Sequence, residues 1–177
     1  KALKDNKPMA DMIENIDIGG PSMIRSAAKN FKDVLIVTDP KDYDGVLSAI
    51  KNNEDTYEYR LNLAYKAFSM TAAYDAMISR YFSEVVGDHF PETLNISLKK
   101  VEHLRYGENS QQKANKYVDP FVQKSLLDYE QLHGKEISFN NLNDLYGAVA
   151  LVREFGDTTV TAAIKHSTPC GVAIGEN

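Results

Sequence analysis

Cysteine is almost missing from this sequence, and its scarcity removes two kinds of framework. The 177 residues contain a single cysteine, Cys170. A lone cysteine excludes an internal disulfide framework and any cluster of cysteine metal ligands. It also favours a reducing, cytoplasmic setting.

Long apolar runs and an excess of positive charge are missing as well. No apolar run approaches the roughly 20 residues that span a bilayer, and the lysines at positions 1 and 4 are not followed by the apolar segment of a signal peptide. The net charge is -5, which argues against general nucleic-acid binding. We therefore expect a cytoplasmic protein that binds neither membranes nor nucleic acid.

Alternating helix and strand patterns predict an α/β fold. The periodicity indicates helices at residues 22–30, 41–51, 56–86 and 140–155, and strands at 34–37, 94–98, 160–164 and 170–174. Residues 99–118 are polar and are expected to be irregular, so we place a domain boundary between residues 97 and 98. The run 170–174 is typical of a buried strand inside a domain, and with the missing initial methionine it indicates a segment of a longer protein.

The longest predicted helix, residues 56–86, carries an aromatic-rich face. Its side chains recur at three- and four-residue intervals, which is the pattern of an amphipathic helix. They are Ala64, Ala67, Phe68, Thr71, Tyr74, Ile78, Tyr81 and Val85. Periodicity by itself indicates only burial, in a core or at an interface.

The first segment that could carry chemistry is residues 16–22, followed by Arg25 and Lys29. Gly19 and Gly20 allow a ligand to approach the backbone, and the start of the next helix offers free N–H groups that suit an anion. Arg25 and Lys29 are four residues apart and share a helix face. The alternative is a capped surface helix with two solvated cations.

The second segment is Arg105-Tyr106-Gly107, which lies in a polar stretch. An arginine there could bind a phosphate through two parallel hydrogen bonds. The alternative is an ordinary linker with one salt-bridged arginine. Farther along the chain, the asparagines and the aspartate of the polar run Asn140-Asn141-Leu142-Asn143-Asp144 suit a helix N-cap, although the side-chain amides could also serve a polar ligand.

The third segment is Lys165-His166, at the end of an apolar strand. The charge of the lysine favours the neutral imidazole, which accepts a proton near pH 7, and the ammonium group can stabilise an oxyanion. Adjacent residues of a regular strand point to opposite faces. Both side chains therefore reach one substrate only if the strand ends or bulges there, and Pro169 favours an early end. The alternative is a structural lysine beside a surface histidine.

Taken in order, five segments resemble the family of bifunctional enzymes that join an aminoimidazole carboxamide ribotide (AICAR) transformylase to an IMP cyclohydrolase. Residues 16–30 are similar to the family's Asp-Ile-Gly-Gly segment and the Arg-x-Ala-Ala-Lys-Asn that follows it. Residues 65–75 resemble the long helix that ends the cyclohydrolase domain, and residues 104–109 resemble the entry to the transformylase domain. Residues 138–144 and 165–171 resemble the first helix start and the catalytic strand of that second domain.

The resemblance implies a fold in two parts. Residues 1–97 would be the C-terminal part of a Rossmann-like (methylglyoxal-synthase-like) cyclohydrolase domain. Residues 98–177 would be the first part of a cytidine-deaminase-like transformylase domain. The family's phosphate loop and its folate contacts would lie outside this chain, so the isolated chain is expected to be inactive.

The resemblance also implies a formyl transfer from 10-formyltetrahydrofolate to the 5-amino group of AICAR. His166 matches the general base of this step, and Lys165 matches the group that stabilises its transition state. Arg105 and Tyr106 match residues that bind AICAR, and Asn141 matches a polar residue of the same pocket. The family's transformylase site is shared between two subunits, so a homodimer is implied, and no metal is needed.

The second implied reaction closes the formamido product to IMP with loss of water. Lys29 matches the catalytic lysine of ring closure, and Asp17 with Ile18 matches a pair that contacts the nucleotide.

Two other classes remain open. A zinc nucleobase deaminase is suggested by Pro169-Cys170, but the second cysteine of the deaminase Pro-Cys-x-x-Cys would fall at Ala173, and the sequence has no His-x-Glu. A non-catalytic module for dimerisation or interdomain docking could use the aromatic face of residues 56–86.

Overall fold

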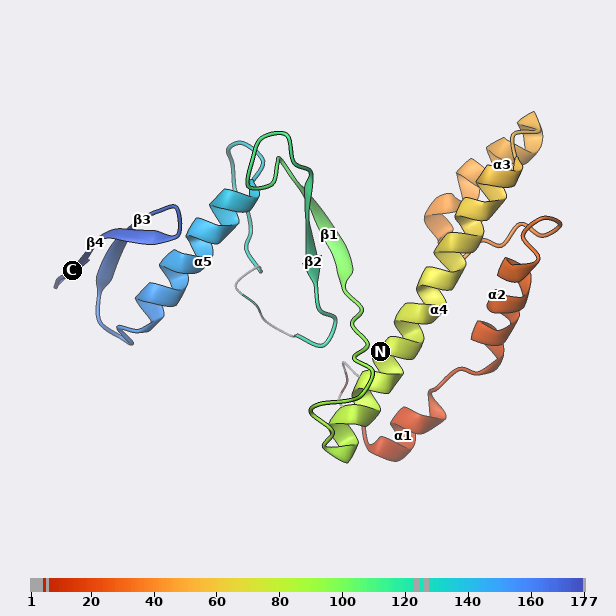
Figure 1. The fold of residues 1–177 in the computed structure, drawn as a ribbon, viewed down its shortest axis with the longest axis horizontal. Coiled ribbons are helices and arrows are strands. Elements are labelled where there is room, and N and C mark those ends of the chain that lie inside the picture. The colour runs from red at the N-terminus through yellow and green to blue at the C-terminus, as the bar shows by residue number, and fades with distance from the viewer. Residues whose placement is uncertain (1–4, 6, 123–124, 126–127, 177) are drawn as a thin grey trace. The chain divides into compact units, whose positions relative to one another are not determined.

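Helices and strands are mixed along the chain, which confirms the α/β character (Figure 1). The computed structural model describes residues 5, 7–122, 125 and 128–176. These form two compact units, unit 1 (Lys1–Ser97) and unit 2 (Leu98–Asn177). The N-terminal lysines used in the signal-peptide argument lie outside the described residues, as does residue 177. None of the described helices is long and apolar enough to cross a membrane.

All secondary-structure elements in the described part of unit 1 are helices. They are α1 (Met9–Glu14), α2 (Gly19–Lys29), the 3-10 helix η1 (Pro40–Asp42), α3 (Tyr43–Asn52) and α4 (Tyr57–Val86). The helices expected at residues 22–30, 41–51 and 56–86 are thus confirmed. The start of α2 differs, because Gly19 and Gly20 lie inside its first turn and do not form a turn before it.

The strand predicted at residues 34–37 is wrong, since these residues belong to no helix or strand. A strand satisfies its backbone groups by pairing with another strand, and the described residues of unit 1 contain none. The segment is half-buried instead, and Ile36 packs against the alanines that join α2 and α4. The apolar pattern predicted the burial correctly and the pairing incorrectly.

The ends of α4 follow from its capping residues. The Thr56 hydroxyl accepts a hydrogen bond from the backbone N–H of Tyr59 at 3.3 Å, which satisfies one free donor of the first turn. Gly87 ends the helix with a left-handed φ of 72°, a conformation that glycine adopts without the steric cost of a Cβ.

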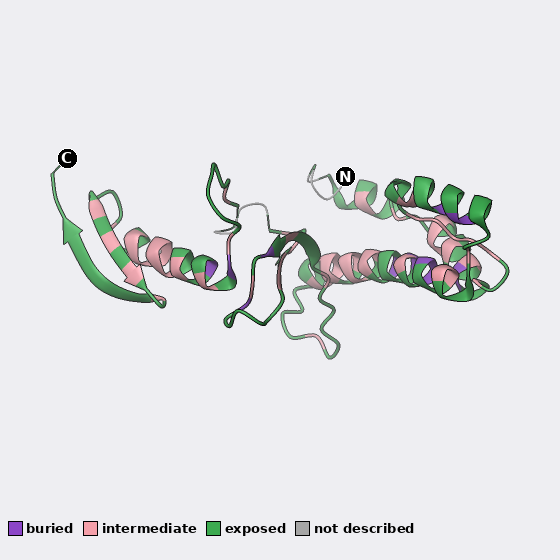
Figure 2. Cartoon of the chain, turned by 90° about the horizontal axis from the view of Figure 1, so that it is seen from above, coloured by how far each residue is buried: buried purple, intermediate pink, exposed green. Residues whose placement is uncertain are grey.

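The contact between α2 and α4 is made largely by alanine. Ala28, Ala64 and Ala67 are at most 2% exposed, and Ile24, Phe31 and Ile36 pack around them. Such small side chains let two helices approach closely. Figure 2 shows the buried positions along both helices. The predicted aromatic face is only partly buried, since Phe68 and Val85 stay exposed.

Unit 2 contains two antiparallel hairpins and one helix. They are β1 (Lys99–Leu104) with β2 (Ala114–Val118), α5 (Phe139–Arg153), and β3 (Val160–Lys165) with β4 (Thr168–Ile174). The predicted helix at 140–155 and the strands at 160–164 and 170–174 are confirmed. β3 packs along α5 (Figure 1), and its exposure alternates from residue to residue, as in a strand with one covered face.

Three expectations for residues 94–177 are wrong. Residues 94–98 are not a strand, and the stretch 99–118 is not irregular but contains the first hairpin. The first strand carries charge at Lys99, Lys100 and Glu102 and buries only Leu104, so it lacks the apolar alternation that predicts strands. β4 was expected to be a buried strand, but it is exposed along its whole length, although it pairs with β3 and contacts α5.

The alanine contact generates a stability prediction. Ala67→Leu is expected to destabilise unit 1 by about 1–3 kcal/mol, because added methyl groups in a close-packed contact force the helices apart and Ala67 is 0% exposed. Urea denaturation followed by circular dichroism measures the change. Ala72→Leu, at an exposed position of the same helix, is the matched control and should unfold like the wild type. Equal midpoints for both variants would contradict the contact.

Candidate functional site

Arg105 and Tyr106 are fixed beside the start of α5. The backbone N–H of Arg105 donates to the carbonyl of Ile137 at 2.9 Å, and the N–H of Phe139 donates to the carbonyl of Tyr106 at 3.0 Å. The next residue, Gly107, has no room for a side chain, because a Cβ there would lie 2.8 Å from the Cβ of Gln112. The backbone of the dipeptide is therefore held at both ends.

The two side chains of this dipeptide are stacked. The guanidinium carbon of Arg105 lies 4.7 Å from the centroid of the Tyr106 ring, and Nη2 donates to the Tyr106 hydroxyl at 3.1 Å. A guanidinium has five N–H donors, and the Arg105 side chain is exposed. The stack can therefore offer further donors to an anion while the tyrosine fixes the plane of the guanidinium.

The N-terminus of α5 is closed by a capping box. The buried Ser138 hydroxyl accepts from the N–H of Asn141 at 3.3 Å, and Asn141 Oδ1 accepts from the N–H of Ser138 at 3.1 Å. The N-cap is therefore Ser138 and not an asparagine, and Asn141 takes part in the capping as the third residue of the helix. Its neighbour Asn140 donates to the carbonyl of Glu108 at 2.9 Å, which ties the loop after Tyr106 to the helix.

Lys165 and His166 lie where β3 ends. This meets the geometric condition under which both side chains could reach one substrate. Lys165 is the last residue of the strand, and His166 and Ser167 form the two-residue turn into β4. Pro169 does not cause this end, since it lies within β4 opposite Ile164, where the register shifts. The Lys165 and His166 side chains are both exposed.

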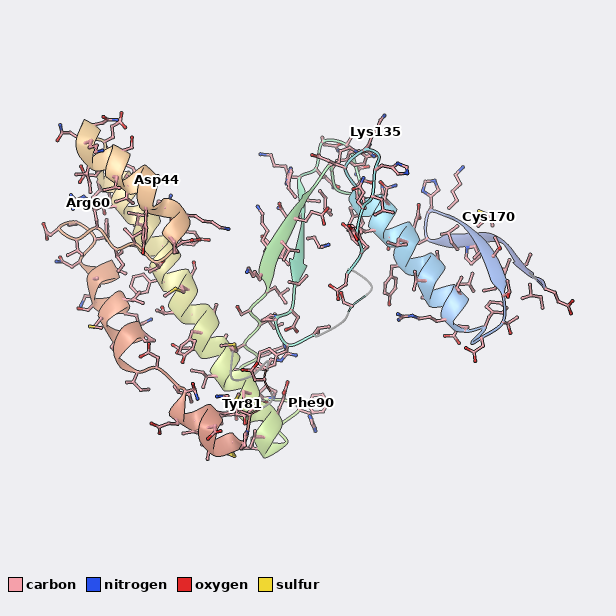
Figure 3. All side chains as sticks on the ribbon, turned by 180° about the vertical axis from the view of Figure 1, so that it is seen from behind. Asp44, Arg60, Tyr81, Phe90, Lys135 and Cys170 are labelled. Atoms are coloured by element: carbon pink, nitrogen blue, oxygen red, sulfur yellow. The ribbon has the colours of Figure 1, made fainter. Side chains whose placement is uncertain are left out.

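This turn rests on α5. The N–H of Ser167 donates to Oδ1 of Asp144 at 2.7 Å, and a Cβ on Gly147 would lie 3.4 Å from the Ser167 carbonyl oxygen. Phe139, which binds Tyr106, and Asp144 are five residues apart, about 7.5 Å along a helix axis. One helix thus brings the Arg105–Tyr106 stack, Asn141 and the Lys165–His166 turn to the same region of unit 2. Figure 3 shows Cys170 on the same hairpin as this turn.

In unit 1, Asp17 closes the start of α2. Its Oδ1 accepts from the N–H of Gly20 at 3.0 Å, and its own N–H donates to the Tyr74 hydroxyl of α4 at 2.8 Å. A Cβ on Gly20 would lie 2.3 Å from Asp17 Oδ2, so a larger residue there would displace the Asp17 carboxylate. Ile18 is 72% exposed.

A small apolar pocket lies beside the start of α2 and has a volume of about 190 Å³. Its lining comes from the start of α2 and the middle of α4, namely Asp17, Pro21, Ile24, Met70, Thr71 and Tyr74.

The structure does not bring Lys29 to Asp17 and Ile18. Lys29 is exposed in the last turn of α2, 11 residues after Ile18, which is about 16.5 Å along the helix axis at 1.5 Å per residue. Arg25, on the face shared with Lys29, lies 5.5 Å from the centroid of the Phe68 ring. Of the two predicted cations, Arg25 therefore has an aromatic partner in α4.

Comparisons with known proteins identify the family of this chain. A family model described as "AICARFT/IMPCHase bienzyme" matches residues 27–177. The chain belongs to this bienzyme family. The matched range includes Lys29 and the predicted site residues of unit 2, and Asp17 and Ile18 precede it.

Several relatives of the bienzyme family carry the description "Bifunctional purine biosynthesis protein PurH". The protein of Clostridioides difficile (strain 630) is 52% identical over 177 residues, which is 99% of this chain and 35% of the relative. That of Oceanobacillus iheyensis is 52% identical over 94% of this chain and 33% of the relative. That of Bacillus cereus (strain B4264) is 53% identical over 98% and 34%. The chain thus spans about a third of the length of these relatives.

The described residues contain no group of three or more His, Cys, Asp or Glu side chains that could hold a metal ion. The zinc-deaminase alternative therefore gains no support from this part of the chain, where Cys170 is exposed on β4.

Sequence reasoning missed two structural supports of the site. Asp144 was included in a polar run interpreted as capping, and its spacing of three from Asn141 was the available signal that both share a helix face. The other support joins Glu102, Lys116 and Tyr129. No local pattern connects these residues, because Tyr129 lies 27 positions beyond Glu102.

This second support braces the first hairpin. Glu102 Oε2 accepts from the Tyr129 hydroxyl at 2.7 Å and lies 3.0 Å from Lys116 Nζ, which in turn lies 4.0 Å from the centroid of the Tyr129 ring. The hydrogen bonds from Tyr129 and Lys116 lower the pKa of the Glu102 carboxyl. Burial, and then the bond to Glu102, raise the pKa of the Tyr129 hydroxyl to about 12.

The brace gives a pH-dependent stability difference between the wild type and Tyr129→Phe. The variant loses a hydrogen bond to a charged group, which is expected to cost about 1 kcal/mol. Because the folded pKa of Glu102 is lowered from 4.5, its contribution is present above that pH and is lost as the pH falls through the folded value. Because the folded pKa of Tyr129 is raised from 10.0 to about 12, its contribution is lost over that alkaline range.

Urea denaturation followed by circular dichroism, repeated across this pH range, measures the difference. Tyr117→Phe, at an exposed position of β2, is the matched control. A difference between wild type and Tyr129→Phe that is independent of pH would show that the brace does not contribute.

Proposed function

We propose that this chain is the junction segment of an enzyme that makes IMP in two successive steps of purine nucleotide biosynthesis. The observation that carries the proposal is that one helix, α5, binds both the loop with the Arg105–Tyr106 stack and the turn with Lys165 and His166. This segment also matches the bienzyme family. An anion-binding group and a base–cation pair are the parts that formyl transfer to a nucleotide requires.

In the first proposed step, Arg105 binds the phosphate end of AICAR and Asn141 contributes its amide to the same pocket. The 5-amino nitrogen attacks the formyl carbon of the co-substrate 10-formyltetrahydrofolate. His166 accepts the proton of this amine, and Lys165 stabilises the oxyanion of the tetrahedral centre. The bond from carbon to N10 then breaks, N10 takes the proton back from His166, and tetrahydrofolate leaves.

In the second proposed step, the carboxamide nitrogen of the formamido product attacks the formyl carbon, and water is lost as the ring closes. Lys29 stabilises the oxyanion of this addition, and Asp17 with Ile18 contacts the nucleotide. The exposure of Ile18 and Lys29 supports their access to a ligand. The distance between the ends of α2 requires that the ligand extend along the helix or that a second subunit complete the site.

The domain assignment follows from the same proposal. Unit 1 would be the C-terminal part of a methylglyoxal-synthase-like, Rossmann-like cyclohydrolase domain, and unit 2 the first part of a cytidine-deaminase-like transformylase domain. We further propose a cytoplasmic homodimer that uses a folate co-substrate and no metal, and that binds neither nucleic acid nor membranes.

A docking role for α4 is the second candidate, and one observation favours it. Leu61, Tyr65 and Phe68 are exposed and follow one another at intervals of four and three residues, so they form one apolar stripe along the helix. This stripe is compatible with catalysis if it joins two subunits. As a sole function it predicts that changes at Lys165 and His166 alter neither formyl transfer nor oligomeric state.

A pair of variants in the full-length protein tests the assignment of the two activities. His166→Ala is expected to lower formyl transfer by about 10²–10⁴-fold, the usual contribution of a general base, and to leave closure of the formamido product unchanged. Lys29→Ala is expected to do the reverse. Two separate spectrophotometric assays measure the rates. Lys135→Ala, at an exposed lysine of unit 2 that the proposal does not use, is the control (Figure 3). Loss of both activities in either variant would contradict the separation of the sites.

The isolated 177-residue chain is expected to be inactive in both assays. It spans about a third of its relatives, and the proposal also requires the family's phosphate loop and its folate contacts, which are expected outside this chain. Measurable formation of IMP from the purified chain would show this expectation to be wrong.

A further inference from the structure

We propose that Asp144 is a positioning residue for formyl transfer, because its carboxylate holds the turn that carries Lys165 and His166 against α5. This inference rests on the proposed function and deepens it. Asp144 does not act on the substrate in this proposal. It fixes the backbone from which the base and the cation project.

The turn has a conformation that its own residues do not favour. His166 has a φ of 51° and Ser167 a φ of 59°. Two left-handed residues in a two-residue hairpin are the pattern of a type I′ turn, which Asn-Gly and Asp-Gly adopt most readily. For residues with a Cβ this region is unfavourable. A His-Ser turn of this kind therefore persists when its surroundings hold it.

The hold comes from two residues of α5. Asp144 accepts the Ser167 N–H at 2.7 Å, a hydrogen bond to a carboxylate that is stronger than a neutral one. Gly147, three positions later on the same helix face, lies directly against the turn, since a Cβ built there would meet the Ser167 carbonyl oxygen at 3.4 Å and its Cα at 3.6 Å, which are ordinary contact distances.

The side chain of Ser167 does not share in this hold. Its Oγ is buried and has no hydrogen-bond partner among the described residues. The hydrogen bond from the Ser167 backbone N–H to Asp144 is therefore the polar contact that fixes the position of the turn on α5.

The position of the turn on α5 matters because the same helix also holds the loop with the proposed nucleotide-binding residues. Phe139 and Asn140 of the first turn bind the backbone of Tyr106 and Glu108. A general base must come within about 2.6–3.2 Å of the proton it accepts, and a displacement of about 1 Å can reduce the rate about 100-fold. The bond from Asp144 thus sets the distance between the base and the bound nucleotide.

The test compares three variants in the full-length protein. Asp144→Ala removes the acceptor, and kcat for formyl transfer should fall by about 10–100-fold, with KM for AICAR changed less than about threefold. Asp144→Asn keeps an oxygen that can accept the Ser167 N–H and should restore most of kcat. Asn143→Ala, at the exposed neighbouring position of the helix, should behave as the wild type.

Two further readouts separate positioning from loss of folding. Ring closure, assigned to unit 1, should stay unchanged in all three variants. Hydrogen exchange of the Ser167 amide should be slow in the wild type and Asp144→Asn, and faster in Asp144→Ala. If Asp144→Ala does not fold, Gly147→Leu tests the same contact, because its side chain must displace the Ser167 backbone, and it should lower kcat in the same way.

The outcomes that overturn the inference are distinct from those that overturn the proposed function. A wild-type protein without formyl transfer would refute the function. With an active wild type, an unchanged kcat and unchanged Ser167 exchange in Asp144→Ala would refute the positioning role. An equal loss in Asp144→Asn and Asp144→Ala would also refute it, because the hydrogen-bond acceptor would then not be the cause.

Discussion

The arrangement of unit 2 depends on polar contacts made by the first two turns of α5. The free N–H groups of a helix start need acceptors, and Ser138 supplies one through the capping box. The same turns bind other segments, since Phe139 and Asn140 contact the loop after β1 and Asp144 binds the turn after β3. Segments that are about 60 residues apart in the sequence are therefore placed by one rigid element.

Unit 1 is organised by a different kind of contact. Alanines on α2 and α4 allow the two helices to lie close together. Because the helices are close, the Tyr74 hydroxyl of α4 reaches the backbone N–H of Asp17, which fixes the start of α2 beside the pocket. A larger side chain in the contact would change the position of Asp17 without touching it. Packing and site geometry are thus linked in this unit.

Features that depend on local pattern were predictable from the sequence. The length of α4 follows from its periodicity, its Thr56 cap and its terminal Gly87, and β3 and β4 follow from apolar runs around a short turn. Features that depend on distant partners were not. The run at residues 34–37 has the composition of a strand, yet strand formation depends on a neighbour that a local pattern does not specify. The first strand was missed for the opposite reason, because charged side chains form a strand there through pairing with β2.

The candidate site shows the same division between local and distant information. Lys165, His166 and Arg105 were identified by residue type and by family resemblance, and the structure adds how their backbones are held. The role of Asp144 depends on its contact with a residue 23 positions away, so its place in a polar run at a helix start suggested only a cap. The separation of Lys29 from Asp17 likewise became evident only when α2 was seen to extend without interruption between them.

The stacking of Arg105 on Tyr106 has a consequence for the thermodynamics of recognition. A free arginine side chain loses much rotational freedom when an anion immobilises it, and this loss weakens binding. Here the aromatic ring and the hydroxyl of Tyr106 already restrict the guanidinium before a ligand arrives. Most of the ordering thus occurs when the protein folds, and an arriving anion meets a donor whose plane is already set. A lysine at this position would lack the planar group that makes such preorganisation possible.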